Sequence, residues 1–291
     1  MEAVAPSCVA QQSVPVLENV EIARDTFRIR LDDPRMAQAI LPGQFLMIRP
    51  TEETSPLLGR PFAVYDVARD RDGTPFAVDV VYLVVGRGTS ALAGCRPGDR
   101  VTTWGPLGHG FGPPPEGPVV FVAGGIGQTP FLALGRWWLG RADYGISLVD
   151  APRGGSHATS ATLLYGVRTA ALAAGVADFL AAGIEVELAT DDGSAGHHGF
   201  VTQLLQDRLE RGERPAKVVG CGPPPMLAAL TKIVTRYEIP CDLSLENHMA
   251  CGFGACFSCV APIRQPDGSI DLRRVCVEGP IFPAASVAWP D

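Results

Sequence analysis

The chain has 291 residues, of which 46% are hydrophobic and 19% charged, and its formal net charge is −7. This length suits two domains with a small appendage, and the apolar content predicts packed cores. The negative charge and the lack of any run of lysine and arginine argue against a nucleic-acid-binding protein, because phosphate neutralisation requires clustered cations.

The N-terminal region shows no targeting signal. Residues 1–14 lack a basic segment followed by an apolar core, so we predict a tail and no signal peptide. No apolar run reaches the length of a transmembrane helix. We therefore expect a cytoplasmic protein with reduced thiols at the scattered cysteines Cys8, Cys95, Cys221 and Cys241.

Residues 15–115 are predicted to form an antiparallel β-barrel. Short apolar runs separated by Gly, Pro and Asp occur at 16–33, 41–50, 60–70, 76–86 and 99–108. Such punctuation is typical of a barrel or a sandwich. Arg60 and the Gly88-Thr89 pair lie at the ends of two of these runs and offer a guanidinium, backbone N–H groups and a hydroxyl to a diphosphate. A solvated strand end and a hairpin turn are the alternatives for these positions.

Residues 116–240 alternate buried strands with helices, which predicts a doubly wound parallel sheet. The expected strands are 119–125, 161–169, 184–193 and 216–222, and the expected helices are 130–140, 172–183, 200–212 and 227–237. The polar stretch 150–162 is predicted to be a surface loop or insertion.

Three loops of this domain are candidates for dinucleotide binding. Gly124, Gly125 and Gly127 follow the first strand and open a helix, Asp191 follows the third strand, and Cys221-Gly222 follows the fourth. Ligands of open parallel sheets bind at the carboxyl ends of strands, and glycines let the backbone approach a pyrophosphate. The first loop departs from the usual G-x-G-x-x-G fingerprint, so an ordinary strand-to-helix turn stays open for it.

Residues 241–291 are predicted to form a small 2Fe-2S subdomain. Cys251, Cys256 and Cys259 are spaced C-x4-C-x2-C, and Cys276 follows on the return strand of a predicted hairpin, 260–277. This is the ligand pattern of plant-type 2Fe-2S clusters. A zinc site and disulfides are the alternatives, but zinc usually takes ligands in two close pairs and disulfides require an oxidising compartment.

The motifs RPFAV, GRGTSAL, GGIGQTP and CGPPPM occur in the order of the flavin and nicotinamide loops of the ferredoxin–NADP reductase superfamily. The segment MACGFGACFSCV, with RVCVEGPIF after it, resembles one family in particular, the electron-transfer subunits of NAD-dependent (class 1B) dihydroorotate dehydrogenase. The resemblance implies a six-stranded FAD barrel, an NAD-binding α/β domain and a C-terminal 2Fe-2S subdomain.

The resemblance also implies roles for individual residues. Those expected to bind FAD are Arg60, Pro61, Phe62, Ala63, Val81, Tyr82, Leu83, Gly88 and Thr89, with Cys221 as a catalytic residue at the nicotinamide and the four cysteines as cluster ligands. Two positions depart from the family pattern: Ala63 replaces a hydroxyl residue and Leu83 replaces a basic one.

The function implied by the resemblance is an electron relay in pyrimidine biosynthesis. Electrons would pass from the FMN of a dihydroorotate dehydrogenase catalytic subunit through the cluster and FAD to NAD+, in a complex with two of each chain. One alternative is a related subunit of a sulfhydrogenase or of a ferredoxin-linked transhydrogenase. Another is a scaffold module that has lost its flavin, for which the departures at Ala63 and Leu83 are the support.

Overall fold

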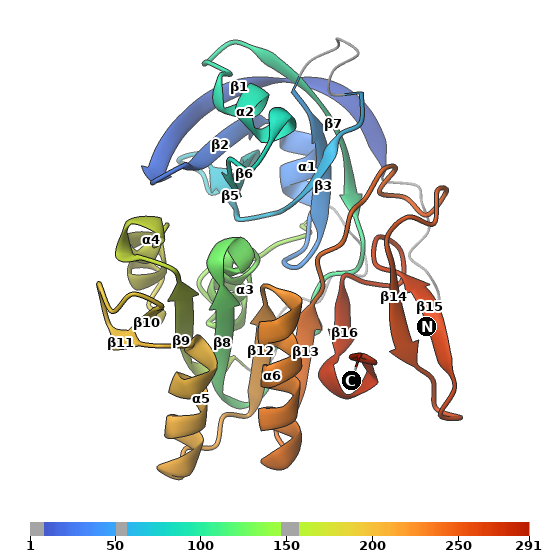
Figure 1. The fold of residues 1–291 in the computed structure, drawn as a ribbon. Helices are drawn as coiled ribbons and strands as arrows, with labels where there is room; N and C mark the ends of the chain where they lie inside the picture. The colour runs from blue at the N-terminus through green and yellow to red at the C-terminus, as the bar shows by residue number, and fades with distance from the viewer. Residues whose placement is uncertain (1–8, 51–56, 147–156, 291) are drawn as a thin grey trace.

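The computed structural model describes residues 9–50, 57–146 and 157–290. It consists of a β-barrel stacked on an α/β domain, with a hairpin-bearing segment at the side of both (Figure 1). The barrel strands are β1 (Ala10–Ala23), β2 (Thr26–Asp32), β3 (Phe45–Arg49), β4 (Arg60–Ala63), β5 (Asp66–Arg69), β6 (Pro75–Leu83) and β7 (Arg100–Leu107). Two short helices accompany them, α1 (Pro34–Ala39) and α2 (Arg87–Ala93).

The barrel sheet has the order β4-β3-β7-β1-β2-β6-β5. The neighbours β4 and β5 in the sequence thus lie at opposite edges of the sheet. The Val64–Tyr65 connection joins these edges, because Val64 donates its N–H to Gln44 beside β3 and Tyr65 donates its N–H to Asp79 on β6. The predicted antiparallel barrel is confirmed, with seven strands instead of six because the 60–70 run divides here.

The second sheet has the order β11-β10-β9-β8-β12-β13-β16. Its strands are β8 (Gly117–Gly124), β9 (Ala158–Val167), β10 (Glu185–Thr190), β11 (His197–His198), β12 (Lys217–Cys221), β13 (Cys241–Ser244) and β16 (Ile281–Pro283). All pairs are parallel except β13 with β16. The helices are α3 (Phe131–Trp138), α4 (Val176–Ala181), α5 (Val201–Glu210) and α6 (Pro224–Arg236), and short 3-10 turns lie at Gly125–Gln128, Ala170–Leu172 and Ala284–Ser286.

The side chains of β8 alternate between the two faces of the sheet, as the predicted doubly wound fold requires. Phe121 packs in one buried cluster with α3 and α4, whereas Val120 and Val122 pack in the other with α5 and α6. Both faces of the strand are therefore buried, as a parallel sheet requires.

Three sequence-based boundaries differ from the structure. Residues 10–14, predicted as tail, begin β1, and residues 158–162, predicted as loop, begin β9; residues 1–8 and 147–156 lie outside the described residues. In addition, β13 pairs with β12 and β16 pairs with β13, so parts of the predicted cluster subdomain complete the second sheet. The strand β13 is too short to show a period in the sequence.

The predicted hairpin is confirmed. It consists of β14 (Val260–Arg264) and β15 (Ile270–Arg274), which pair antiparallel, with Pro266-Asp267-Gly268 in the turn. Gly268 donates its N–H to Gln265 and has a φ of +85°, a backbone conformation that favours glycine. The hairpin returns the chain toward Cys276.

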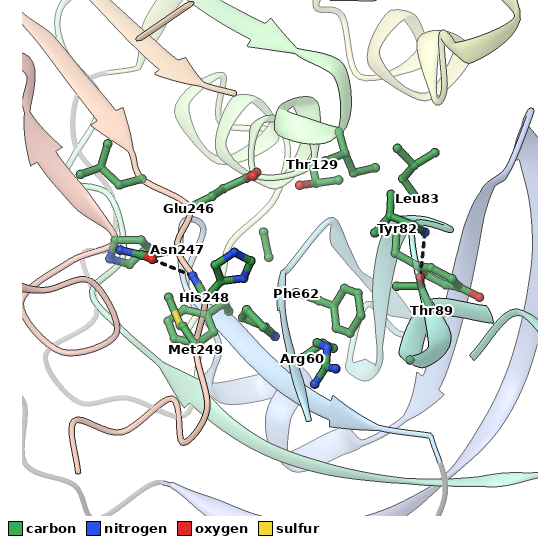
Figure 2. Close-up of a pocket in the computed structure, with 18 of the residues that line it drawn as sticks. Arg60, Phe62, Tyr82, Leu83, Thr89, Thr129, Glu246, Asn247, His248 and Met249 are labelled. Atoms are coloured by element: carbon green, nitrogen blue, oxygen red, sulfur yellow. Dashed lines mark hydrogen bonds between the residues drawn. The ribbon is translucent and has the colours of Figure 1, made fainter. Parts of the chain in front are cut away.

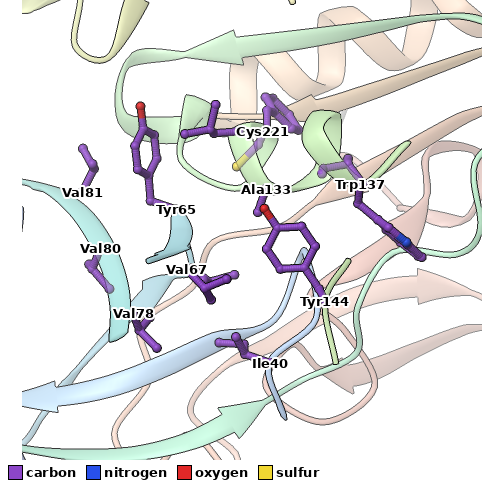
Figure 3. Packing of buried hydrophobic residues seen from close by; sticks show 14 of the residues in the cluster. Ile40, Tyr65, Val67, Val78, Val80, Val81, Ala133, Trp137, Tyr144 and Cys221 are labelled. Atoms are coloured by element: carbon purple, nitrogen blue, oxygen red, sulfur yellow. The ribbon is translucent and has the colours of Figure 1, made fainter. Parts of the chain in front are cut away.

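The barrel and the α/β domain share a buried core (Figure 3), to which Val67 and Val80 of the barrel and Ala133 and Trp137 of α3 all belong. Polar contacts reinforce the junction. The Tyr65 hydroxyl donates to Asp178 on α4 over 2.9 Å, and the Tyr144 hydroxyl donates to Asp66 over 2.6 Å. These contacts fix the orientation of the two domains that surround the candidate site.

Candidate functional site

A cavity of about 1020 Å³ opens between the barrel and the segment that follows β13. Figure 2 shows Arg60 and Phe62 of β4 on one side and Glu246, Asn247 and His248 on the other. All nine residues expected to bind FAD line this cavity: Arg60, Pro61, Phe62, Ala63, Val81, Tyr82, Leu83, Gly88 and Thr89. The barrel thus brings together residues from β4, β6 and α2 that are distant in the sequence.

Arg60 is exposed at the cavity, and its Nη1 donates to the carbonyl oxygens of Leu58 and Gly59 at 2.9 and 3.1 Å. The other guanidinium nitrogens make no hydrogen bond to described residues. Because a guanidinium carries five N–H donors, this arrangement leaves donors for an anionic ligand.

The Thr89 hydroxyl was expected to bind a diphosphate, but it forms hydrogen bonds within its own loop. Its hydroxyl accepts the N–H of Val85 at 2.9 Å and that of Gly86 at 3.2 Å, and it donates to the Gly86 carbonyl at 3.1 Å. The hydroxyl therefore shapes the loop, and the groups that this loop offers to a phosphate are backbone N–H groups. Arg87 also lines the cavity and adds a cation that the sequence analysis did not select.

A second cavity, of about 700 Å³, lies at the carboxyl ends of the parallel strands. Gly124, Gly125, Asp191 and Gly222 line it, as predicted from their places after β8, β10 and β12. Gly127 is not in the lining: a Cβ there would lie 2.3 Å from the Cys221 carbonyl oxygen, so this glycine permits close packing of two loops. The exposed ring of Phe200 lies at the same cavity.

The two cavities meet at Leu83, Ile126 and Glu246, which line both of them. The Cys221 thiol donates to Glu246 Oε1 over 3.8 Å at this junction. Burial raises the pKa of the Cys221 thiol and also that of the Glu246 carboxyl, although Glu246 is accessible from the cavities. Each shift extends the pH range over which the group keeps its proton.

The four predicted ligand cysteines converge at the end of the segment after Glu246. Cys251 lies near Cys256, Cys259 lies near Cys276, and Cys251 is also close to Cys276. Hydrogen bonds from Ser258 lower the pKa of Cys256 to about 6, which favours the thiolate that binds iron.

The cysteine geometry also bears on the alternatives. All described cysteines are free thiols, so the structure contains no disulfide among them. No three His, Cys, Asp or Glu side chains of the described residues surround a single ion position. A 2Fe-2S group takes four thiolates spread over two irons, and the four cysteines that gather here, with their spacing, fit this group.

The sequence analysis missed the side chains of the 244–250 segment. Ser244, Glu246, Asn247 and His248 line the first cavity, and Met249 and Ala250 follow them toward Cys251. The Asn247 side chain accepts the His248 N–H at 2.7 Å and donates to the Val260 carbonyl at 2.9 Å, which fixes the segment against the hairpin. Residues 244–252, SLENHMACG, also resemble the family, and this was the signal available in the sequence for these residues.

Comparison with known proteins agrees with this geometry. Residues 13–111 match the family described as the oxidoreductase FAD-binding domain, and residues 246–288 match the iron-sulfur cluster binding domain of dihydroorotate dehydrogenase B. A dihydroorotate dehydrogenase B (NAD(+)) electron transfer subunit from Desulforamulus reducens is 34% identical over 94% of this chain and 97% of its own. The chain belongs to this family of electron-transfer subunits.

A second family member, from Geobacillus thermodenitrificans, is 35% identical over 96% of this chain and 99% of its own. The solved structure of an NADH-dependent reduced ferredoxin-NADP oxidoreductase has a TM-score of 0.75 at 27% identity and covers 95% of this chain and 90% of that one. The expected superfamily fold is thereby confirmed, as are an FAD-binding domain and an iron-sulfur domain.

Membership of this family makes the chain an oxidoreductase subunit that works with a catalytic subunit. Among the described residues, no helix is both long and apolar enough to span a bilayer.

Proposed function

We propose that this subunit carries electrons between a dihydroorotate-oxidising partner and NAD+. In this proposal the first cavity binds FAD, the second binds NAD+, and Cys251, Cys256, Cys259 and Cys276 hold a 2Fe-2S cluster. FAD exchanges hydride with nicotinamide and single electrons with the cluster, which is the chemistry that the cofactors supply. The chain's own residues bind, orient and shield these groups.

The observation that carries the proposal is the continuity of the three sites. Glu246 lines both cavities, and only four residues separate it from Cys251 in the sequence. A flavin in the first cavity would thus lie next to both the nicotinamide site and the cluster loop. This order matches a relay in which each transfer takes place between neighbours.

At the cavity junction, Glu246 and Cys221 lie next to the expected hydride-transfer position. The raised pKa of Glu246 lets the carboxylic acid donate a hydrogen bond or a proton toward a flavin nitrogen. Cys221 is buried and its thiol is kept neutral, so it supports Glu246 by its hydrogen bond and does not act as a nucleophile. The Ala63 side chain offers no hydroxyl there, which leaves this task to Glu246.

Two charged side chains of the second cavity bear on the choice between NAD and NADP. Asp191 lies at the end of β10 on the cavity lining. A carboxylate at such a strand end accepts hydrogen bonds from the ribose hydroxyls and repels a 2′-phosphate. Arg168 also lines the cavity, so the balance between the two side chains decides the preference.

The partner is expected to dock beside the cluster. Val9, Leu57, Leu58, Trp104 and Phe253 line a depression of about 290 Å³ next to Cys251, and Phe253 and Leu57 are exposed. An apolar surface of this kind marks a protein contact, and electron transfer requires the donor to be close to the cluster. We propose an FMN-bearing dihydroorotate dehydrogenase catalytic subunit there, two of each chain per complex, in the cytoplasm.

The test is reconstitution. The purified chain should show flavin and iron-sulfur absorbance and should reduce artificial acceptors with NADH, but it should leave dihydroorotate unchanged. Addition of an FMN-bearing dihydroorotate dehydrogenase catalytic subunit should give dihydroorotate-dependent NAD+ reduction. If reduced ferredoxin replaces dihydroorotate as the donor, the related transhydrogenase assignment is correct; a chain without flavin bands would support the scaffold alternative.

A further inference from the structure

Arg274, at the end of β15, contacts the cysteine loop at two places, one between Cys251 and Cys256 and one between Cys256 and Cys259. Its Nη1 donates to the Gly254 carbonyl at 3.2 Å, and its guanidinium lies over the ring of Phe257, 4.8 Å from the ring centroid. Gly254 lies between Cys251 and Cys256, and Phe257 lies between Cys256 and Cys259. One side chain therefore ties the hairpin that carries the fourth cysteine to the loop that carries the first three.

Glu278 holds this guanidinium in place. Its carboxylate accepts from Arg274 Nη2 at 2.6 Å and from Nε at 3.2 Å, and it also accepts the Arg274 backbone N–H at 2.7 Å. Such a fork-shaped pair fixes the direction of the guanidinium as well as its charge. The Glu278 N–H in turn donates to the Arg274 carbonyl at 2.8 Å, so the turn that contains Cys276 is closed around the pair.

Gly254 connects the arginine to a cluster ligand. Its carbonyl accepts from Arg274, and its backbone N–H lies near the Cys276 side chain. Its φ is +88°, and a Cβ would lie 2.6 Å from Val277 Cγ2, so the residue has little freedom to move. Any shift of the Gly254 peptide would move its N–H relative to Cys276.

Phe257 provides the second attachment. Its φ of +56° is a left-handed conformation that bulky residues rarely adopt, and its ring is exposed. Because no core surrounds the ring, its contact with Arg274 is the interaction that the structure shows holding it. The side chain of Arg274 thus stabilises an unfavourable backbone conformation directly beside Cys256.

We propose that Arg274 is a positioning residue for the 2Fe-2S cluster: it fixes the ligand loop so that Gly254 donates to the Cys276 sulfur, and thereby raises the cluster's reduction potential. Hydrogen bonds to cluster sulfurs and nearby positive charge favour the reduced cluster, which carries one more negative charge. The inference rests on the proposed function, since it requires the cluster at the four cysteines.

The test compares three variants of the full-length holoprotein. Arg274→Gln removes the charge and the fork, and Arg274→Lys keeps the charge but loses the fork. Arg273→Gln is the matched control, because it removes the same charge from the adjacent residue, whose side chain pairs with Asp271 at 3.1 Å and Gln265 at 3.0 Å. Iron and sulfide content is measured first, followed by an EPR-monitored redox titration of the cluster.

We expect a more negative midpoint potential in Arg274→Gln, a smaller negative shift in Arg274→Lys, and the wild-type potential in Arg273→Gln. If both Arg274 variants lose their iron while Arg273→Gln keeps it, the loss of iron itself supports the positioning role of Arg274. A fully loaded Arg274→Gln or Arg274→Lys protein with the wild-type potential would overturn the inference. A wild-type chain that binds no iron would instead contradict the proposed function, so the two failures are distinguishable.

Discussion

The thiol of Cys221 lies 3.8 Å from the carboxylate of Glu246, at the junction of the two cavities. Cys221 ends β12 in the α/β domain, and Glu246 begins the segment that leads to the cluster loop. This pair therefore connects the expected nicotinamide site with the path toward the four cysteines.

Glu246→Gln is expected to slow flavin reduction by NADH about tenfold or more, because a positioned proton donor or charged hydrogen bond contributes at least this much to a rate. FAD content should remain unchanged. The measurement is the stopped-flow rate of flavin bleaching as a function of pH. Since burial raises the pKa of Glu246 above 4.5, the neutral acid persists below the folded pKa and is lost as pH rises through it. The wild-type rate should fall over that pH range, and the Glu246→Gln rate should not. If the pH profiles of the two proteins are identical, Glu246 takes no part in flavin reduction.

Replacement of Cys251, Cys256, Cys259 or Cys276 by serine is expected to remove or gravely weaken the cluster, because each thiolate is one of four ligands. Iron and acid-labile sulfide per chain are measured. Cys95→Ser is the control, since this half-buried free thiol lies in the barrel. A full cluster in the Cys276→Ser protein would show that the fourth ligand lies elsewhere.

Arg60→Ala should weaken FAD binding roughly tenfold or more, since a charged contact to a diphosphate contributes about 1.5–3 kcal/mol. Fluorescence titration of the apoprotein with FAD measures the affinity. Arg100→Ala is the matched control, because this exposed arginine of β7 bonds to Ser13 and does not line the cavity. Equal FAD affinities of the two variants would mean that Arg60 is a solvated strand end and does not contact the diphosphate.

Gly127→Ala should destabilise the fold by about 1–3 kcal/mol, because overpacking against a rigid neighbour forces the backbone to move. The added Cβ would lie 2.3 Å from the Cys221 carbonyl oxygen, whereas a Cβ at Gly112 would meet no atom within 4 Å. Thermal unfolding of Gly127→Ala and Gly112→Ala is compared. A Gly127→Ala protein as stable as its Gly112→Ala control would mean that the two loops are not packed as described.

The sequence predicted those parts of the molecule whose signals are local. The strand–helix alternation predicted the doubly wound sheet, and the cysteine spacing selected four candidate ligands that the fold brings together. It could not assign β13 and β16 to the second sheet, because short strands carry no period and their pairing partners are distant. The sequence also predicted a free hydroxyl at Thr89, but this hydroxyl forms hydrogen bonds to the backbone of Val85 and Gly86. Glu246 and Arg274 gain their importance from contacts made only after folding.

Phe253→Glu is expected to weaken association with the catalytic partner by about 2–5 kcal/mol if the contact is desolvated, since it buries an unpaired charge. Phe253 is a better probe than Phe257, because a glutamate at position 257 would face the Arg274 guanidinium and be neutralised. Size-exclusion chromatography of the mixed subunits measures association. Leu272→Glu, an exposed apolar position on β15, is the control. Co-elution of the Phe253→Glu protein at wild-type strength would place the docking surface elsewhere.

The central claim is tested most directly by NAD+ reduction with dihydroorotate as the electron donor, using the complex of this chain with its catalytic subunit. The account predicts turnover by the wild-type complex, none by either subunit alone, and loss of turnover when Cys256→Ser removes the cluster but FAD remains bound. Dihydroorotate-dependent NAD+ reduction at the wild-type rate by a complex without the cluster would contradict it.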